Sequence, residues 1–235
     1  MTIQAVILAA GMGTRLARPH PKPLTRLRDG RTIMTQQVQH LKATFGEELR
    51  LSIVVGFKLE QIMEHVPHAS FVYNELFDQT NTSKSLLKAL RNSSEGGVLW
   101  LNGDVVFDPM LLEHLRPQLE ADESFVAVDT SAVSDEEVKY TIDDDGYIDG
   151  LSKTLANGLG EAIGINYVSS GDKIALIRRL EDVPDQEYFE GGIILSIRKD
   201  GIKYRPVDIS QFFAVEIDSQ DDLVRANRQI SINWA

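Results

Sequence analysis

The sequence predicts an α/β fold, because short apolar runs alternate with helical patterns through its first half. The run that begins at Ile3 has the length and β-branched content of a buried strand. We expect a Rossmann-like three-layer α/β/α architecture with a mostly parallel central sheet and a small additional β lobe. The expected strands cover residues 3–9, 51–56, 70–73 and 97–102, and the expected helices cover residues 34–44, 59–65, 83–92 and 109–119.

The alternation of strands and helices ends after a strand expected at 125–128, and shorter strands then follow one another with turns between them. Two of these turns are Asp145-Gly146 and Asn157-Gly158. The whole chain, 1–235, is expected to form one domain with halves at 1–124 and 125–235. The remaining expected elements are strands at 139–142, 147–151, 161–168 and 213–217, helices near 171–181 and 186–196, and a final helix from residue 220.

Composition and charge exclude several classes of function. With 235 residues, of which 43% are hydrophobic and 25% charged, the chain can bury a substantial core. A net charge of −11 argues against a broad surface for nucleic acid or an anionic membrane, although a nucleotide needs only a local positive cleft. No apolar run approaches the roughly 18 residues that span a bilayer, so we expect a cytoplasmic protein. The lack of cysteine excludes thiolate metal sites, and the five histidines have no ligand spacing.

A glycine loop follows the first expected strand and has the character of a phosphate cradle. At Gly11 and Gly13, backbone N–H groups can approach an anion closely. Arg15 then adds a fixed guanidinium and Lys22 a mobile ammonium. The loop lacks the third glycine of a dinucleotide-binding turn, and no Gly-Lys-Ser/Thr follows, so neither the Rossmann dehydrogenase pattern nor the P-loop fits.

Together with Pro-Lys-Pro-Leu at residues 21–24, this loop resembles the signature of nucleotidyltransferases that join a nucleoside triphosphate to a phosphorylated small molecule. The resemblance implies that Arg15 contacts the triphosphate and that Lys22 contacts phosphates near the reacting phosphorus, which makes both catalytic candidates. The alternative is an ordinary strand-to-loop turn with two surface cations. The implied nucleotide-binding residues of this segment are Leu8, Ala9, Ala10, Gly11, Gly13, Thr14 and Arg15.

Two acidic segments complete the expected phosphate chemistry. Asp104 follows an apolar strand, where its carboxylate can face the glycine loop and bind Mg²⁺ together with phosphate oxygens. The resemblance implies that Asp218 is the other metal ligand, and Glu216 lies two residues away on the same side of a strand. Alternatively, Asp218 or Ser219 caps the last helix. Metal binding predicts that Asp218→Asn abolishes turnover, whereas capping predicts nearly normal rates, because Asn also caps.

A polar segment after the third expected strand indicates which nucleotidyltransferases the chain resembles most. Sugar-phosphate nucleotidyltransferases usually have a Gly-Thr-Ala-like turn where this chain has Asn-Thr-Ser at 81–83. With the preceding Asn74-Glu75 pair, the segment looks more like cytidylyltransferases that act on phosphocholine, aminoalkylphosphonates or inositol phosphate. Cytosine presents an exocyclic amine, so its site needs an acceptor. The candidate contacts to base and ribose are Asn74, Glu75, Asn81, Thr82, Ser83 and Asn102, of which Thr82 or Ser83 is alternatively a plain helix cap.

Acceptor recognition is expected in the small β lobe and the helix after it. Lys139 and Lys153 resemble positions that meet the acceptor phosphate, although either is alternatively a solvated strand lysine. Glu161 resembles an acidic residue that contacts the organic part of the acceptor, and Glu190 is a second such candidate. The nearby tyrosines would suit a quaternary ammonium, carboxylates a primary amine, and mixed polar groups a polyol.

The sequence therefore predicts a Mg²⁺-dependent cytidylyltransferase that transfers CMP from CTP to a small phosphate- or phosphonate-bearing acceptor and releases pyrophosphate. The expected partners are these two substrates, without nucleic acid or membrane, and a homodimer is left open. One alternative is a sugar-1-phosphate uridylyl- or thymidylyltransferase. The other is a regulatory relative that binds nucleotide without turnover, but such relatives typically lose the lysine or the metal acids that this chain retains.

Overall fold

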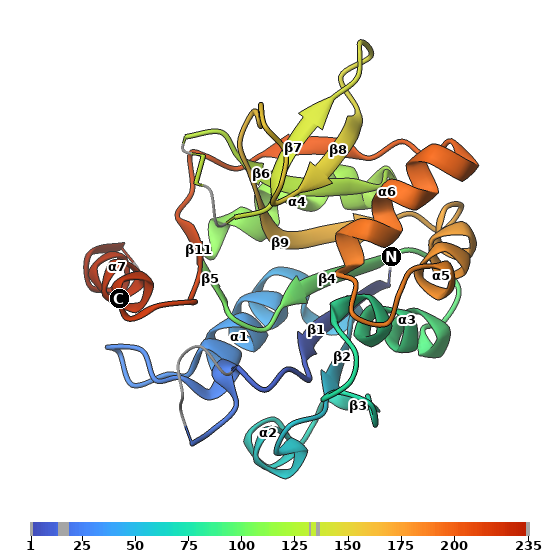
Figure 1. Cartoon of the computed structure of the whole chain (residues 1–235). Helices are drawn as coiled ribbons and strands as arrows, with labels where there is room; N and C mark the ends of the chain where they lie inside the picture. Colours follow the sequence, from blue (N-terminus) through green and yellow to red (C-terminus); the bar gives the residue numbers. More distant parts are fainter. Residues whose placement is uncertain (1, 14–18, 132, 135–136, 234–235) are drawn as a thin grey trace.

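The computed structural model describes residues 2–13, 19–131, 133–134 and 137–233, and the side chains up to residue 230. A central sheet lies between two layers of helices (Figure 1). The strands along this sheet are, in order, β10 (Arg205–Asp208), β6 (Phe125–Asp129), β9 (Glu161–Val168), β4 (Val98–Asn102), β1 (Ile3–Ala9), β2 (Leu49–Val55) and β3 (Ser70–Tyr73). Only β9 among these seven runs antiparallel to its neighbours, so the sheet is mostly parallel, as the sequence predicts.

β1 is the central strand of the parallel part and places the glycine loop. It pairs with β2 on one side and β4 on the other, and nearly all of its side chains are buried. Alternate residues face opposite layers: Ile7 packs with one group of helices and Leu8 with the other. Because parallel strands end at the same edge, the segments after β1 and β4 lie side by side, and the Gly103 N–H donates to the Leu8 carbonyl (2.9 Å).

The helices complete the two outer layers. Each buries one apolar stripe against the sheet, which accounts for the periodic apolar positions in its sequence. One layer contains α1 (Ile33–Phe45), α2 (Leu59–His65) and α4 (Met110–Glu120), and the other contains α3 (Thr82–Asn92), α5 (Lys173–Asp182) and α6 (Phe189–Asp200).

Smaller elements lie around the sheet. β5 (Val105–Phe107) pairs antiparallel with β11 (Ala214–Glu216), and the final helix α7 (Gln220–Asn233) packs on this pair through a separate apolar cluster. β7 (Lys139–Ile142) and β8 (Ile148–Ser152) form a hairpin that projects from the sheet (Figure 1). Two short 3₁₀ helices cover Lys22–Leu24 and Gly46–Glu48.

Two strands were not predicted from the sequence, and the reasons are physical. β5 follows Asp104 directly and has three residues, too few to show a period. β10 contains Pro206, which weakens any strand prediction, but the strand lies at the edge of the sheet, where proline is tolerated. The other expected elements are present, with bounds that differ by a few residues at most.

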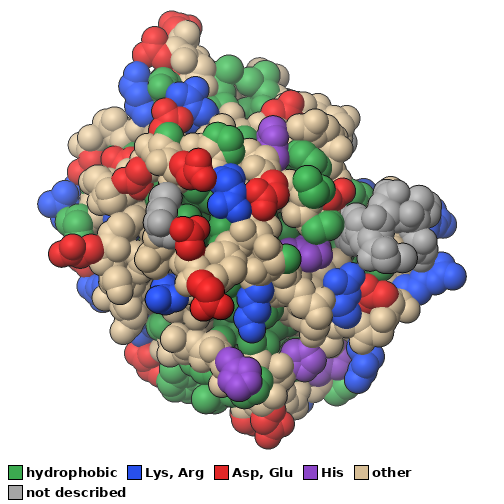
Figure 2. Space-filling view, turned by 180° about the vertical axis from the view of Figure 1, so that it is seen from behind, with side chains coloured by type: hydrophobic (Ala, Val, Ile, Leu, Met, Phe, Trp, Pro, Cys, Tyr) green, Lys and Arg blue, Asp and Glu red, His purple; other side chains and the backbone are tan. Residues whose placement is uncertain are grey.

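Figure 2 shows acidic and basic side chains interspersed on one face of the described part of the chain. Within that same part, none of the helices combines the length and apolarity that crossing a membrane requires.

Candidate active site

A cavity of about 350 Å³ opens beside the carboxyl ends of β1 and β4. Its position is the one expected for a ligand site in an α/β sheet. The structure brings most of the predicted site residues to its walls. Those that line it are Leu8, Ala9, Gly11, Gly13, Lys22, Asn81, Thr82, Asn102, Asp104, Lys153, Glu190, Glu216 and Asp218.

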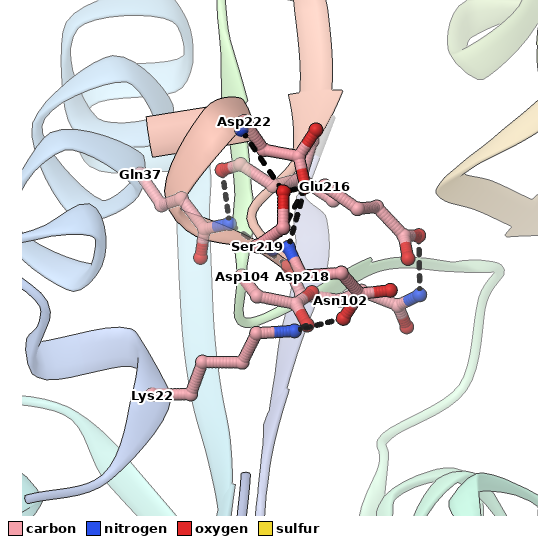
Figure 3. A network of polar contacts seen from close by, with 9 residues as sticks. Lys22, Gln37, Asn102, Asp104, Glu216, Asp218, Ser219 and Asp222 are labelled. Atoms are coloured by element: carbon pink, nitrogen blue, oxygen red, sulfur yellow. Dashed lines mark hydrogen bonds and ion pairs between the residues drawn. The ribbon is translucent and has the colours of Figure 1, made fainter. Parts of the chain in front are cut away.

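Lys22 lines this cavity and lies between two carboxylates (Figure 3). Its Nζ atom is 2.5 Å from Asp104 Oδ2 and 2.5 Å from Asp218 Oδ1. Only 13% of the lysine side chain is exposed. Burial lowers the pKa of Lys22, but attraction to Asp104 and hydrogen bonds to both carboxylates outweigh it, so the pKa is raised. Lys22 is therefore held as a cation at a defined point.

The β5–β11 pair places these two acids together although they are far apart in the sequence. Asp104 directly precedes β5, and Asp218 follows β11 by two residues. The antiparallel register continues past Glu216, because the Ile217 N–H donates to the Asp104 carbonyl (3.0 Å). The unpredicted strand β5 is thus what positions the predicted metal ligands.

The cap of α7 is made by other residues than Asp218. The Ser219 N–H donates to Asp222 Oδ2 (2.8 Å), and the Asp222 N–H donates to Ser219 Oγ (3.2 Å), a reciprocal capping arrangement. The Asp218 N–H also points to Asp222 (3.2 Å), while the Asp218 carboxylate faces Lys22. The carboxylate of Asp218 is therefore available to the cavity.

Glu216 is held by Asn102 rather than by Lys22. Asn102 Nδ2 donates to Glu216 Oε1 (2.9 Å), as Figure 3 shows. Burial chiefly, and then repulsion from Asp104, raises the pKa of Glu216 well above its usual range, although the Asn102 hydrogen bond opposes this. Gly164 makes room for the pair: its φ is +65°, and a Cβ there would lie 2.5 Å from both Asn102 Nδ2 and Glu216 Oε1.

The donor set suits a hard divalent cation. The carboxylates of Asp104 and Asp218 already converge on one positive charge, and Mg²⁺ is commonly bound by one or two carboxylates plus substrate phosphates. Within the described residues, no group of three or more His, Cys, Asp or Glu side chains is arranged to hold a metal ion by itself. The residues present thus fit Mg²⁺ that is shared with phosphate oxygens.

The glycine loop forms the wall next to Lys22. Gly13 has a φ of +58°, and a Cβ there would lie 3.1 Å from Lys22 Cβ, so the loop packs closely on the lysine. Ala10 is buried, and its carbonyl accepts from the Phe57 N–H (3.0 Å), so it supports the loop without lining the cavity. The predicted contacts at Thr14 and Arg15 lie outside the described residues.

The polar segment at 74–83 divides into residues inside and outside the cavity. Asn81 and Thr82 line it, but Ser83 is buried behind them. Asn74 is 1% exposed, and its Nδ2 donates to Thr80 and Ser85 (3.1 Å each), so it fixes the segment from behind. Glu75 pairs on the surface with Lys88 (2.8 Å). The structure therefore does not bring Ser83, Asn74 or Glu75 to this cavity.

Glu190 and Lys153 also line the cavity. Glu190 is 9% exposed, and its buried Oε2 has no hydrogen-bond partner. Burial raises the pKa of Glu190 to about 7. Tyr188 and Phe189, the aromatic residues directly before Glu190 in the sequence, also line the cavity. Glu137 lines it as well and was not predicted, because nothing in its local sequence distinguishes it from a surface glutamate.

Two other acceptor candidates lie outside this cavity. Lys139 is buried against Gly158, where a Cβ would lie 2.7 Å from the lysine Cβ. Glu161 lines a second, larger hollow of about 1080 Å³ and accepts from the Ser134 N–H. The two hollows adjoin, since both are lined by Glu137, Lys153, Ala162, Glu216 and Asp218.

Comparisons with known proteins identify the family of the chain. The model of the MobA-like NTP transferase domain matches residues 5–141. The CMP-5'-(3-aminopropyl)phosphonate synthase of Streptomyces rubellomurinus is 37% identical over 128 residues, which are 51% of this chain and 20% of that protein. The 2-aminoethylphosphonate cytidylyltransferase of Lancefieldella rimae is 26% identical over 230 residues, which are 93% of this chain and 89% of that protein. The chain thus spans only a fifth of the first relative's length, but most of the second's.

Solved structures show the same fold. The inositol-1-phosphate CTP transferase from T. maritima has a TM-score of 0.78 at 17% identity, with 100% of this chain and 98% of that chain covered. The CTP:phosphocholine cytidylyltransferase from Streptococcus pneumoniae has a TM-score of 0.77 at 16% identity, with 98% and 100% covered. A putative glucose-1-phosphate thymidylyltransferase from Bacillus anthracis also scores 0.77 at 16% identity, with 100% and 98% covered. Since the family model covers more than half of the chain, the protein belongs to the MobA-like NTP transferase family and is a nucleotidyltransferase.

Proposed function

We propose that this protein is a Mg²⁺-dependent cytidylyltransferase that transfers CMP from CTP to a small aminoalkylphosphonate and releases pyrophosphate. The observation that carries the proposal is the buried Lys22 ammonium, fixed 2.5 Å from each of two carboxylates on the wall of a cavity. The names of the two aminoalkylphosphonate relatives support the choice of nucleotide and acceptor.

The reaction needs positioning and charge neutralisation more than proton transfer. A phosphonate oxygen attacks the α-phosphorus of CTP in line, the bond from that phosphorus to the bridging oxygen breaks, and pyrophosphate leaves with the electron pair. A phosphomonoester has a second pKa of about 6, so a comparable acceptor is already largely ionised at neutral pH and no general base is required. The attack brings the negative charges of the phosphonate and the triphosphate together, and positive groups in the site have to neutralise them.

The chain's own residues divide this work. Lys22 lies where its ammonium can contact the phosphates next to the reacting phosphorus, and Gly11 and Gly13 offer a close backbone approach to the triphosphate. Asp104 and Asp218 would hold Mg²⁺, which supplies further neutralisation of the phosphate charge when bound. Asn102 keeps the third carboxylate, Glu216, at the edge of this group.

The acceptor end favours a primary amine. Glu190 is almost fully buried, and its Oε2 atom has no partner, so an ammonium group that donates to it would satisfy a costly buried acceptor. A quaternary ammonium has no N–H to donate, and a neutral polyol brings no positive charge to the carboxylate. Lys153, on the same wall, offers positive charge to the phosphonate.

A sugar-1-phosphate nucleotidyltransferase is the second candidate. The shared fold of the Bacillus anthracis protein supports it, since that protein is described as a putative glucose-1-phosphate thymidylyltransferase. Such an enzyme would keep the phosphate end and differ in the base and acceptor pockets. The two candidates therefore separate by nucleotide choice and by acceptor.

Binding of nucleotides tests the proposal first, because a ligand that binds only the folded state raises its melting temperature. We expect a Mg²⁺-dependent rise with CTP that exceeds the rise with UTP, dTTP, ATP or GTP. Pyrophosphate release with CTP should then require 2-aminoethylphosphonate and be weaker with phosphocholine or inositol 1-phosphate. Selective stabilisation by UTP or dTTP would favour the sugar-phosphate alternative, and no response to any nucleotide would contradict both.

A further inference from the structure

Two helices begin side by side at the rim of the cavity, one from each half of the chain. α3 begins at Thr82 and α6 at Phe189, and both residues line the cavity. Four hydrogen bonds join the segments before and around these starts. They run from the Asn81 N–H to the Asp185 carbonyl (2.8 Å), from Asn81 Nδ2 to the Gln186 carbonyl (3.2 Å), from the Ser83 N–H to the Glu187 carbonyl (3.4 Å) and from Gln186 Nε2 to the Gln79 carbonyl (2.5 Å).

A fifth hydrogen bond connects Thr82 directly to the start of α6. The residue before that helix, Tyr188, makes no side-chain cap. Instead, the Phe189 N–H donates to Thr82 Oγ1 (3.1 Å). An N-cap normally comes from the residue just before the helix, and here a threonine from another helix performs that task. Glu190 follows Phe189 immediately, so this bond fixes the turn that carries the buried carboxylate.

We propose that Thr82 is a positioning residue for acceptor recognition, because it caps α6 from outside and thereby holds Glu190 in the cavity. The inference deepens the proposed function and rests on it for the identity of the acceptor. The sequence interpretation gave Thr82 to the nucleotide. The hydroxyl oxygen nevertheless accepts from the acceptor-side helix, so its loss acts first on Glu190 and the group that Glu190 meets.

Two properties of the site make this effect separable from general instability. Asn81 caps α3 through its own side chain, since Asn81 Oδ1 accepts from the Thr82 N–H (2.8 Å), so α3 keeps its cap when the threonine hydroxyl is removed. Glu190 also belongs to α6, whereas Lys22 lies in a 3₁₀ helix and Asp104 and Asp218 flank the β5–β11 pair, so a shift of α6 need not disturb the phosphate-binding residues.

Thr82→Val is the test variant, because it keeps the shape of threonine but has no oxygen. Thr82→Ser restores the oxygen and serves as the rescue. Thr32→Val is the matched control, since Thr32 caps α1 through the Thr35 N–H (3.1 Å) and does not line the cavity. The KM for 2-aminoethylphosphonate, the KM for CTP and kcat are measured for each, with hydrogen exchange of the peptide that contains the Phe189 amide.

We expect Thr82→Val to raise the KM for 2-aminoethylphosphonate about five- to tenfold, the size of one hydrogen bond, with the KM for CTP unchanged. Exchange at the start of α6 should accelerate in Thr82→Val but not in Thr82→Ser or Thr32→Val. In the double variant of Thr82→Val and Glu190→Gln, the two effects on the KM for 2-aminoethylphosphonate should be less than additive, because Thr82 acts through Glu190.

An equal rise in the KM for CTP, full additivity with Glu190→Gln, or unchanged exchange at α6 would overturn the inference. Failure of the proposed function is read from the wild-type protein alone, as absence of CTP-dependent turnover of 2-aminoethylphosphonate. In that case, the exchange comparison of Thr82→Val with Thr82→Ser still decides whether Thr82 caps α6.

Discussion

In one part of the cavity wall, the Lys22 end, an ammonium lies 2.5 Å from each of two carboxylates, whereas in another part, the Glu190 end, a buried carboxylate oxygen has no hydrogen-bond partner. The Lys22 end is thus balanced before any substrate binds. The Glu190 end is not, since burial chiefly raises the pKa of that carboxyl to about 7, although attraction to Lys153 opposes this. The first arrangement is preorganised for charge, and under the proposed function the acceptor completes the second.

This contrast connects stability with specificity. A buried polar atom without a partner costs about 1–3 kcal/mol, so the Glu190 end is expected to lower the stability of the free protein. The Lys22 end avoids much of that cost, because opposite charges meet there. Variants at the two ends should therefore differ in their effects. Loss of the Lys22 charge should remove activity, whereas loss of the Glu190 charge should raise the free energy of unfolding and weaken binding of the acceptor.

The largest effect is expected from Lys22→Ala. Loss of a charge that stabilises the transition state should lower kcat by about 10³-fold, in the upper part of the range for one such group. The fold should persist, because Lys22 lies in a short 3₁₀ helix at the cavity wall and not in the apolar core. Lys203→Ala is the control, since Lys203 pairs with Asp145 on the projecting hairpin (3.0 Å). Rates like those of the wild type in Lys22→Ala would remove the basis of the proposed mechanism.

The Lys22 end was predictable from sequence because its signal is local. The strand at residues 3–9, the glycines after it and Lys22 lie within one short stretch whose pattern indicates both structure and chemistry. The acids Asp104 and Asp218 were also identified, but their meeting depends on β5, a strand too short to predict. The local sequence patterns could not indicate the register between β5 and β11, which brings these two acids together.

The Glu190 end was only partly predictable because its properties come from packing. Whether Glu190 is buried, and whether its oxygen has a partner, depends on α6 and on Thr82, which is distant in the sequence. The same limit applies to Asn74 and Glu75, for which a polar pattern indicated contact with the base. Their side chains instead face Ser85 and Lys88, and the sequence alone cannot specify those rotamers.

Glu190→Gln should have the next largest effect and change stability and binding in opposite directions. Loss of a charged hydrogen-bond partner should raise the KM for 2-aminoethylphosphonate about 10- to 100-fold. In the wild type, burial raises the pKa of Glu190 from 4.5 to about 7, so the folded state holds this proton more tightly than the unfolded state. That contribution to stability is complete below pH 4.5 and is lost as the pH rises through about 7.

The neutral glutamine should therefore be more stable than the wild type at pH 8 by up to about 3 kcal/mol, with little difference at pH 4.5. Denaturant unfolding across this pH range measures the difference. Glu64→Gln, at an exposed glutamate of α2, controls for the change in net charge. A difference that does not grow with pH would show that the free protein satisfies Glu190 in another way.

Gly164→Ala should have a smaller effect, confined to the Lys22 end. A Cβ at this position would meet the ends of the Asn102 and Glu216 side chains, which can move apart and so lose their hydrogen bond. Gly201→Ala is closely matched in backbone strain, with φ of +69° against +65°, but a Cβ there meets nothing within 4 Å. Both variants should lose a similar 1–2 kcal/mol of stability, and only Gly164→Ala should lose turnover several-fold. Equal turnover in the two would mean that the Asn102–Glu216 bond has no part in positioning the acids.

The smallest effect is expected at Glu75, which the sequence pattern placed near the base and the structure places in a surface ion pair with Lys88 (2.8 Å). Because exposed pairs contribute little, Glu75→Gln should leave the melting temperature unchanged. The ratio of kcat/KM for CTP and UTP should also stay the same, since the carboxylate does not line the cavity. Asn81→Ala provides the contrast, because Asn81 does line it and a change in that ratio is expected there. If Glu75→Gln altered nucleotide choice instead, the ion pair with Lys88 would have to open when nucleotide binds, and the Lys22 end would be less completely preformed than this structure indicates.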